Sequence, residues 1–224
     1  MRMAQPITLE DIKARHDVQT YIKRADENME AIGYTEHGFR HATVVSERAR
    51  SSMTSLGREP REAELAAIAG YLHDIGNVAA RAEHGQIAVM LVYEILTQMG
   101  MPPEELAEIM SGVGNHEEQY GDPFGAVAAA VIIADKSDVA RSRVRDIHPS
   151  RYDEHDRVNY ATISSSLIVN HARTLISLSL EIDTTIAPIM EYFELFLSRM
   201  VMSRRAAVKL GCEFELVING TKLL

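Results

Sequence analysis

The sequence predicts a mainly α-helical protein that ends in a small α+β appendage. Over residues 1–148, apolar residues recur every three or four positions in successive segments, and several of these segments stop at a glycine. After Pro149 the pattern changes to alternating and β-branched residues, followed by one long helical segment and an Asn-Gly turn. We therefore expect a helical domain over 1–148 and an α+β appendage over 149–224.

The first three helices follow from apolar spacing and from residues that start or stop helices. Thr8 can cap a helix that continues to Gly33, and a second helix is expected over 36–56, stopped by Gly57. A third helix starts near Pro60, which suits a first helical turn, and runs to the end of an apolar stripe at residue 72. These three segments are interpreted as packing helices.

Three further helices are expected before the appendage. One covers 84–99, and the next follows Pro103 and ends near Gly114. The last covers 124–144 and opens with 11 uncharged residues, which predicts a central helix surrounded on all sides. Asp135 is the first charge in this segment, and a carboxylate there is costly to bury unless it is paired or binds a metal ion.

The appendage is expected to contain strands over 160–169 and 174–183, a helix over 188–210, and a hairpin over 213–224. The hairpin is predicted from Asn219-Gly220, the strongest two-residue turn signal. The apolar residues of this short segment exceed what it can cover alone, so we expect them to pack against the helical domain or a second copy of the chain. A homodimer through the appendage is therefore predicted.

Composition and charge argue against several classes of protein. The formal net charge of −9 does not suit a surface that neutralises nucleic acid or an anionic membrane. The single cysteine, Cys212, fits a reducing compartment and is interpreted as a small buried apolar residue. The N-terminal residues lack an apolar run of signal-peptide length, and the longest uncharged apolar run is too short to span a bilayer. We expect a cytoplasmic protein without membrane or nucleic-acid partners.

The adjacent pair His73-Asp74 stands where the third helix ends, and this pair is the first candidate for chemistry. Neighbouring helical residues point about 100° apart, so the two side chains can converge on one ion only near a helix end. Further imidazoles and carboxylates occupy similar positions, at or near helix ends or where a buried helix becomes polar. The full set is His41, His73, Asp74, His84, His116 and Asp135.

Four imidazoles and two carboxylates suit a pair of divalent ions, with iron, zinc, nickel, cobalt and manganese all compatible. Two such ions need a bridging ligand. A carboxylate can bridge ions that lie about 3.5–4 Å apart, the arrangement used for displacement at phosphorus. Asp74 is the natural candidate for this bridge.

The order His41, His73-Asp74, Asp135 resembles the H…HD…D pattern of the HD-domain superfamily of metal-dependent phosphohydrolases. The resemblance covers about residues 33–145 and implies an HD-type helical bundle. Members with two metals add two histidines between the HD pair and the last aspartate, and His84 and His116 fall at those positions. The resemblance implies one metal held by His41, His73, Asp74 and Asp135, and a second held by Asp74, His84 and His116.

The chain departs from two branches of this superfamily. Asn77 follows the motif where many HD phosphodiesterases have lysine, and Asn115-His116 stands where the HD-GYP branch has two adjacent histidines. The short interval from Asp74 to His84 is similar to HD domains of the ribonuclease Y type, but no RNA-binding module of the KH type precedes it. A cyclic-dinucleotide or RNA substrate is therefore not favoured.

Two basic residues after Asp135 are candidates for contact with substrate. Lys136 and Arg141 are interpreted as ligands of phosphate oxygens beside the metals, because a guanidinium can bind two oxygens at once. The alternative for this charged run is a solvated helix face. Asp138 is expected to hydrogen-bond a metal ligand from outside. The other histidines are interpreted as surface or structural residues; they are His16, His37, His148, His155 and His171.

These inferences predict a metal-dependent phosphohydrolase, either a phosphomonoesterase or a phosphodiesterase. The expected substrate is a small phosphate ester, a nucleotide or cyclic nucleotide, attacked by a hydroxide that bridges two divalent ions. Catalysis is assigned to Asp74, Lys136 and Arg141. Two alternatives stay open: the same ligand set resembles HD-fold di-iron oxygenases, and a metal-stabilised interaction module without turnover would also fit.

Overall fold

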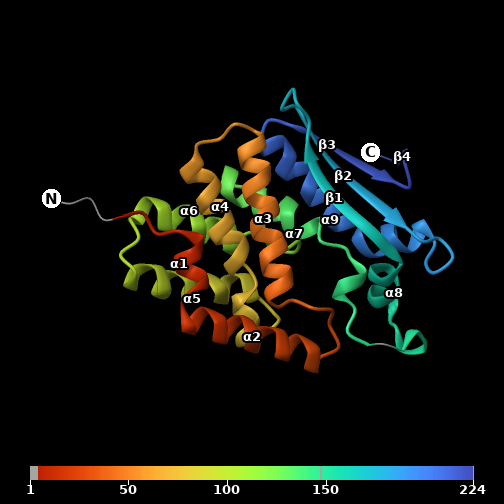
Figure 1. Cartoon of the computed structure of the whole chain (residues 1–224), viewed down its shortest axis with the longest axis horizontal. Helices are drawn as coiled ribbons and strands as arrows, with labels where there is room; N and C mark the ends of the chain where they lie inside the picture. The colour runs from red at the N-terminus through yellow and green to blue at the C-terminus, as the bar shows by residue number, and fades with distance from the viewer. Residues whose placement is uncertain (1–4, 147, 224) are drawn as a thin grey trace.

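The computed structural model describes residues 5–146 and 148–223, and within them the chain forms nine α-helices, three short 3₁₀ turns and one four-stranded sheet (Figure 1). The helices that begin the chain lie at one end of an elongated molecule, and the sheet lies at the other. The helical part consists of α1 Leu9–Lys13, α2 His16–Ala31, α3 Phe39–Ser55, α4 Pro60–Leu72, η1 Ile75–Val78, α5 His84–Gln98, α6 Pro103–Gly114 and α7 Ala126–Lys136. After it come η2 Arg141–Arg143, η3 Pro149–Arg151, α8 Glu154–Ala161, β1 Thr162–Val169, β2 Leu175–Ile182, α9 Ile189–Lys209, β3 Glu213–Ile218 and β4 Thr221–Lys222. The prediction of a mainly α protein with a C-terminal α+β part is confirmed.

The first predicted helix is in fact two. Thr8 caps α1 as expected: its hydroxyl accepts the Asp11 backbone N–H at 3.3 Å, and the Asp11 carboxylate accepts the Thr8 N–H at 2.8 Å. The helix then ends at Ala14, because Arg15 has extended backbone angles and α2 starts after it. The apolar spacing continues across this break, which is why the pattern alone predicted one helix.

Helices α3 and α4 approach each other closely at Gly70. A Cβ atom at this position would lie 3.1 Å from the Cα of Ser46, so the absence of a side chain lets the two backbones pack directly. Most of α4 is buried, in keeping with a helix at the centre of a bundle. This packing places His41 of α3 beside the end of α4, where His73 follows.

Helix α7 is surrounded as predicted, but it ends at Lys136 and not near residue 144. All residues from 127 to 134 are buried. The helix stops because side chains take over the hydrogen bonds of its last turn: the Ser137 hydroxyl donates to the Ala134 carbonyl at 2.6 Å, and Arg48 donates to the Ser137 carbonyl at 2.7 Å. The charged run that follows is a turn and loop segment.

The C-terminal part is a four-stranded sheet with order β1-β2-β3-β4. Strands β1 and β2 are antiparallel, β3 pairs parallel with β2 after the α9 crossover, and β4 pairs antiparallel with β3. The predicted hairpin is confirmed at Asn219-Gly220, where both residues have positive φ angles of 49° and 77°. Helix α8, capped by Asp153, was not anticipated, because its short sequence carries mostly charged and polar residues.

Many apolar residues of the C-terminal part are buried against the helical part. Leu178, Leu180, Ile182 and Phe196 are each at most 3 % exposed, and they belong to one apolar core that also contains α3, α4 and α7. The surface that motivated the dimer prediction is therefore covered within the chain. The division at residue 148 stays a prediction, since the core runs across it.

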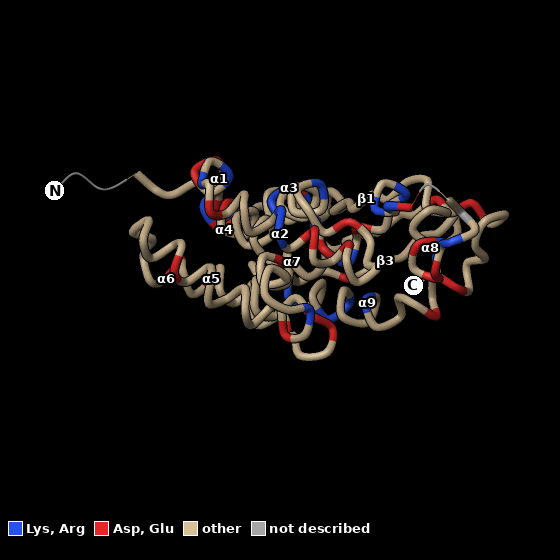
Figure 2. The backbone as a smooth tube through the Cα atoms, turned by 90° about the horizontal axis from the view of Figure 1, so that it is seen from below, with Lys and Arg blue, Asp and Glu red and all other residues tan. Residues whose placement is uncertain are grey.

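Charges are distributed over the whole molecule. In Figure 2 the acidic and basic residues are interspersed along the coloured part of the tube. Cys212 is buried, as expected. Within residues 5–146 and 148–223, no helix has both the length and the apolar character needed to cross a membrane.

Candidate metal centre

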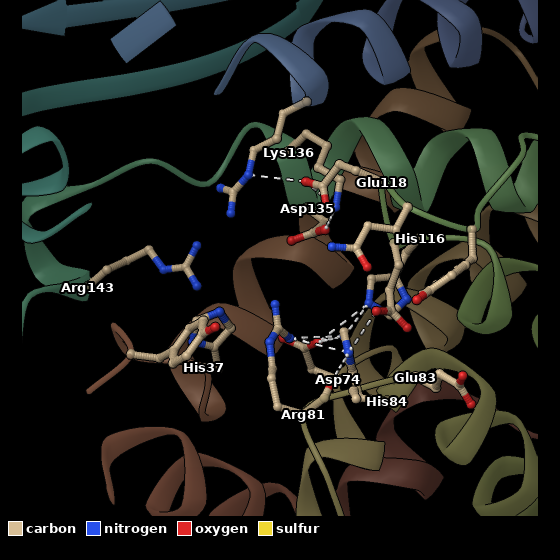
Figure 3. Close-up of a pocket in the computed structure, with 16 residues that line it drawn as sticks. His37, Asp74, Arg81, Glu83, His84, His116, Glu118, Asp135, Lys136 and Arg143 are labelled. Atoms are coloured by element: carbon tan, nitrogen blue, oxygen red, sulfur yellow. Dashed lines mark hydrogen bonds and ion pairs between the residues drawn. The ribbon is translucent and has the colours of Figure 1, made fainter. Parts of the chain in front are cut away.

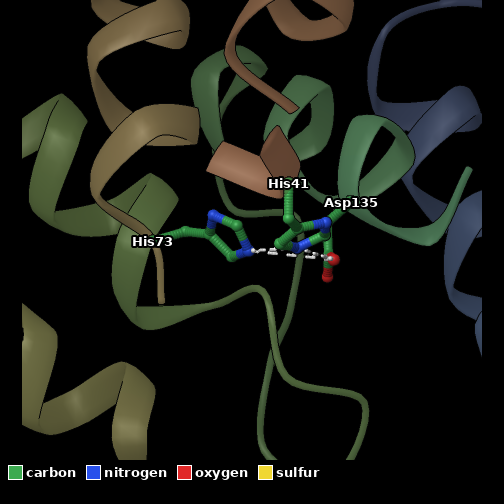
Figure 4. A group of neighbouring side chains, drawn as sticks. All are labelled: His41, His73 and Asp135. Atoms are coloured by element: carbon green, nitrogen blue, oxygen red, sulfur yellow. Dashed lines mark hydrogen bonds and ion pairs between the residues drawn. The ribbon is translucent and has the colours of Figure 1, made fainter. Parts of the chain in front are cut away.

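The structure brings all six predicted ligands to one place. Two lie within helices, His41 in α3 and Asp135 in the last turn of α7. His73 and Asp74 directly follow α4, His84 begins α5, and His116 follows α6. In chain order they are His41, His73, Asp74, His84, His116 and Asp135. Five elements thus contribute to one centre: Figure 3 shows Asp74, His84, His116 and Asp135, and Figure 4 adds His41 and His73.

The first group of ligands consists of His41, His73 and Asp135 (Figure 4). The Nε2 atoms of His41 and His73 lie 3.2 Å apart, and His41 Nε2 lies 3.3 Å from Asp135 Oδ1. One oxygen of Asp74, Oδ2, lies 3.3 Å from His73 Nε2 and 3.6 Å from His41 Nε2. Four side chains therefore direct donor atoms to one small volume.

The second group consists of His84 and His116, together with the other oxygen of Asp74. The two Nε2 atoms lie 2.8 Å apart, and Asp74 Oδ1 lies 3.0 Å from His84 Nε2 and 3.5 Å from His116 Nε2. The two oxygens of Asp74 thus face different groups of histidines. This is the position expected of a bridging carboxylate.

Glycine at position 76 allows this second group to form. A Cβ atom there would collide with the His84 carbonyl oxygen and lie 2.7 Å from the Ala88 nitrogen, so the turn after Asp74 can touch the start of α5 only without a side chain. This backbone contact holds His84 next to Asp74.

Each of the four histidines has its outer ring nitrogen occupied by a protein acceptor. His73 Nδ1 donates to the Gly70 carbonyl at 2.8 Å, and His116 Nδ1 donates to the Val113 carbonyl at 2.7 Å. His84 Nδ1 donates to the Arg81 carbonyl at 3.0 Å, and His41 Nδ1 lies 2.6 Å from Asp138 Oδ2. A carbonyl oxygen can only accept, so the proton of a neutral ring is on Nδ1 and the Nε2 lone pair points inward.

This arrangement fits divalent metal ions. Neutral imidazoles fixed in this way present Nε2 lone pairs to one another at 2.8 and 3.2 Å, which is unfavourable unless a cation or proton lies between them. Two carboxylates, the buried Asp74 and the half-buried Asp135, add negative charge at the same place. Imidazole nitrogen with carboxylate oxygen is the donor set of iron, zinc, nickel, cobalt and manganese sites.

The electrostatics of the centre agree with this interpretation. Burial alone would raise the pKa of Asp74, but the neighbouring histidines lower that pKa well below its usual range. For Asp135, burial is likewise outweighed by Lys136 and His41, which keep its pKa low. Burial would lower the pKa of His84, but the hydrogen bonds that its ring donates to Asp74 and Glu117 raise it to about 9, so a metal ion that binds there would displace a proton. The centre is thus an anionic site that attracts cations.

Lys136 lies beside the centre, as predicted. Its Nζ atom lies 2.6 Å from Asp135 Oδ2 and 3.1 Å from Glu118 Oε1, and the residue is buried. Arg199 of α9 contacts the same Glu118 oxygen at 3.2 Å. Lys136 thereby fixes one carboxylate oxygen of Asp135 and leaves the other, Oδ1, facing His41.

Arg141, the other predicted substrate residue, is not brought to the centre. Its Nε donates to the Tyr160 carbonyl at 2.6 Å, and its guanidinium stacks on the Tyr160 ring, on the exposed side of η2. The expectation placed Arg141 on a continuing helix, whereas α7 ends earlier and the chain turns away. The guanidinium groups that line the cavity belong to Arg81, Arg143 and Arg199.

Asp138 makes the predicted hydrogen bond to His41, one of the candidate metal ligands, at 2.6 Å. The Asp138 carboxylate also accepts two hydrogen bonds from Arg40, at 2.7 and 3.2 Å. Arg143 donates to the Asp138 carbonyl at 2.9 Å. Burial alone would raise the pKa of Asp138, but His41, Arg143 and Arg40 lower it well below its usual range. This network fixes the His41 ring from behind.

Three residues near the centre were not predicted. Glu117 accepts from His84 Nδ1 at 3.2 Å and from the Gly85 N–H at 2.9 Å, Arg81 contacts the His84 ring, and His37 lies on the cavity wall. His37 had been interpreted as a surface or structural residue. Its position four residues before His41, within the helix expected over 36–56, was the available signal, as was the adjacency of Glu117 to His116.

A cavity of about 460 Å³ opens onto the centre, a size typical of sites for small molecules. Figure 3 shows Asp74, His84 and His116 on one side of this cavity and Lys136 with Asp135 on another. Arg81 lies beside Asp74 and His84 in this view. The arrangement provides metal ligands, cations and space for a small anionic molecule.

Comparison with known proteins supports the interpretation of the motif. Residues 36–140 match the family model of the HD domain. The structure is similar to the crystal structure of a predicted HD superfamily hydrolase from an uncultured Thermotogales bacterium, with 18 % sequence identity, a TM-score of 0.46, and coverage of 60 % of this chain and 75 % of that one. No curated protein matches the sequence. The matched stretch contains all six candidate ligands, including the HD pair, and residues 36–140 form an HD domain.

Proposed function

We propose that this protein is a metal-dependent hydrolase of small phosphate esters. The observation that carries the proposal is the position of Asp74, whose two oxygens face two separate groups of histidine Nε2 atoms. Such a centre suits two ions held close together, and two-ion centres of this kind serve displacement at phosphorus. A nucleotide or cyclic nucleotide is the proposed substrate.

The residues divide naturally between two ions. His41, His73, Asp74 and Asp135 would hold one, and Asp74 would share the other with two further histidines. Bound divalent ions supply Lewis acidity, which lowers the pKa of water and stabilises negative charge on phosphoryl oxygens.

Lys136 has two roles in this proposal. Through Asp135 Oδ2 it fixes the orientation of a metal ligand, and its ammonium group lines the cavity. A phosphate group that approaches the centre would therefore meet a buried positive charge. Such a charge stabilises the transition state more strongly than an exposed one because little water screens it.

Arg81 is the second residue that we assign to the phosphate. Its guanidinium lies 3.2 Å from His84 Nε2 and 3.4 Å from Asn77 Oδ1, and in the described part of the chain it forms no ion pair with a carboxylate. A positive charge without such a partner beside a metal centre is available to an anionic substrate. A guanidinium can bind two phosphate oxygens at once. It takes the role that the sequence had suggested for Arg141.

Metal content and hydrolysis test this function together. We expect protein loaded with manganese, iron, cobalt or nickel to hydrolyse nucleotide esters, and we expect about two ions per chain. Asp74→Asn should abolish turnover, and His84→Ala should reduce the content by one ion, whereas the exposed His171→Ala serves as a matched control. Inactivity on a broad nucleotide panel at full metal content would contradict the proposal. Activity with redox-inert zinc would exclude an oxygenase mechanism.

We also propose that the chain forms a homodimer through α9. Although the apolar side chains considered in the sequence are buried, α9 presents a second apolar row to solvent. Its members are Met190, Leu197, Val201 and Val208, which are between 42 % and 68 % exposed. Their spacing of seven, four and seven residues places them on one face of the helix.

A further inference from the structure

The cavity at the metal centre adjoins a second cavity of about 270 Å³. The two cavities share part of their walls. The shared residues are Tyr34, His37, Arg81, Arg143 and Arg199. A molecule whose reactive group lies at the metals can therefore extend past these side chains into the second cavity.

The second cavity is built largely by residues outside the matched HD domain. Tyr34 lies between α2 and α3, His155 belongs to α8, and Phe196 and Arg199 belong to α9. The family model covers 36–140, so none of these four residues falls within it. The C-terminal part of the chain thus contributes one wall of a compartment beside the reactive centre.

Aromatic rings stand on both walls of this compartment. On the C-terminal wall, the His155 ring stacks on the Phe196 ring with a centroid distance of 6.0 Å and an interplanar angle of 14°. On the wall formed by the segment between α2 and α3, Tyr34 is 43 % exposed, and the Arg81 guanidinium lies 5.2 Å from the centroid of its ring. Rings of this kind bind other planar rings by stacking, with little dependence on the identity of the ring.

Positive charge is concentrated where the two cavities meet. Arg81, Arg143 and Arg199 all lie on the shared wall, and Arg143 is buried. Arg143 is fixed by hydrogen bonds to the Glu36 and Asp138 carbonyls, so its charge is held in place. The candidate metal ligands line only the first cavity, the three arginines and Tyr34 line both, and His155 and Phe196 line only the second. A phosphate ester with a ring in its leaving group has the matching order of chemical groups.

We infer that the second cavity is a binding subsite for a planar aromatic or heteroaromatic ring in the leaving group of the substrate. Tyr34 and His155 are its specificity-determining residues, and they discriminate ring-bearing phosphate esters from phosphorylated sugars and other esters without a ring. The orientation of the substrate, phosphate toward the metals and ring toward α8, rests on the proposed function. The C-terminal part of the chain is thus a substrate-selecting wall as well as a packing unit.

Equilibrium binding tests this subsite without any turnover. The probe is the phosphonate analogue of adenosine 5′-monophosphate, in which a methylene group replaces the ester oxygen, and the reference is the same phosphonate of ribose without the base. Calorimetric titration of the full-length chain should show the ring-bearing probe binding about tenfold more tightly than the reference, the size of effect that base stacking gives.

The variants Tyr34→Ala and His155→Ala should each weaken binding of the ring-bearing probe by about tenfold and leave binding of the reference unchanged. Tyr34→Phe keeps the ring and should bind as the natural chain does. Tyr93→Ala and His171→Ala are controls, since Tyr93 is 47 % exposed and His171 is also on the surface, and both lie away from either cavity.

Equal affinity of the natural chain for the two probes would overturn the inference, as would variants that weaken both probes alike. These results are separable from the proposed function, because binding of a phosphonate does not depend on hydrolysis. A chain that prefers the ring-bearing probe but hydrolyses no ester would contradict only the proposed function. A chain that hydrolyses esters but binds both probes equally would contradict only the ring subsite.

Discussion

The candidate metal centre depends on hydrogen bonds that its histidines make away from the cavity. Backbone carbonyls receive the Nδ1 protons of His73 and His116, and carboxylates stand behind His41 and His84. These acceptors fix the tautomer of each ring, so that Nε2 is available inside. The ligand set follows from the sequence motif, but its geometry follows from acceptors that the motif does not contain.

Glu117 gives a direct test of this support. The variant Glu117→Gln keeps an acceptor for the Gly85 N–H but removes the negative charge behind His84. Since loss of such outer contacts costs about 10–100-fold in metal affinity, we expect the ion at His84 and His116 to bind that much more weakly. Metal titration of the variant measures the loss. Glu94→Gln, an exposed change on α5, is the control, and unchanged affinity for both ions would contradict the argument.

Asp138 supports the other half of the centre and also the fold. It is 1 % exposed and is bound by His41, Arg40 and Arg143. Removing one member of a buried charge network leaves its partners uncompensated, so Asp138→Asn should lower the free energy of unfolding by about 3 kcal/mol. Urea unfolding of the metal-free protein measures this change. The exposed Glu47→Gln on α3 should cost far less, and an equal cost for both variants would show that the network adds nothing.

The helices were predictable to different degrees. The centres of α3 to α7 and the three longer strands follow from apolar periodicity, as do the stops at glycine. The break between α1 and α2 and the early end of α7 depend on Arg15 and Ser137, whose local conformations carry no signal in the apolar pattern. Arg141 was misplaced for this reason: a prediction of side-chain position fails when the helix that would carry the residue ends before it.

Gly76 links one turn of chain to the position of α5. Replacing it with alanine would place a methyl group onto the backbone of His84 and Ala88, neither of which can move as a side chain could. We expect Gly76→Ala to destabilise the fold by about 1–3 kcal/mol and to displace His84 from Asp74. Thermal unfolding and metal content measure the two effects. Gly125→Ala, where the nearest atom is the flexible Glu108 carboxylate at 3.3 Å, should change neither.

The contact between α4 and α6 should make stability depend on acid pH. Arg61 of α4 donates through Nε to Glu105 of α6 at 2.7 Å, and this hydrogen bond lowers the pKa of Glu105 in the folded chain. A carboxyl group with a lowered folded pKa stabilises the fold above its unfolded pKa of about 4.3, and the contribution is lost as pH falls through the folded pKa.

We therefore expect Glu105→Gln to cost about 0.5–1 kcal/mol at pH 7, because the pair is only partly shielded from water. The cost should disappear at a pH below the folded pKa of Glu105. Urea unfolding of both chains across this range gives the difference directly. A cost that is the same at both ends of the range would mean that the carboxylate charge contributes nothing.

The C-terminal part of the chain contributes to the core, to the cavity and to the outer surface of the molecule. Its sheet and α9 complete the apolar core, Arg199 reaches the metal-centre cavity, and the outer face of α9 remains apolar. The apolar content of the sequence indicated the contribution to the core and the apolar face of α9. The position of Arg199 at the cavity was not predictable, because it depends on how α9 packs against α7 (Figure 1). No motif in the C-terminal part marks that contact.

Self-association of the chain tests the remaining role of α9. If the row that contains Leu197 and Val201 is covered by a second copy, the full-length protein should sediment as a dimer at micromolar concentration. Leu197→Glu places a charge in the centre of this row and should give a monomer with unchanged metal content, since the residue is 56 % exposed and faces away from the cavity. Glu194→Lys, an exposed charge reversal one turn away, controls for changes in net charge. A natural chain that sediments as a monomer would contradict the dimer and leave the outer face of α9 as ordinary surface.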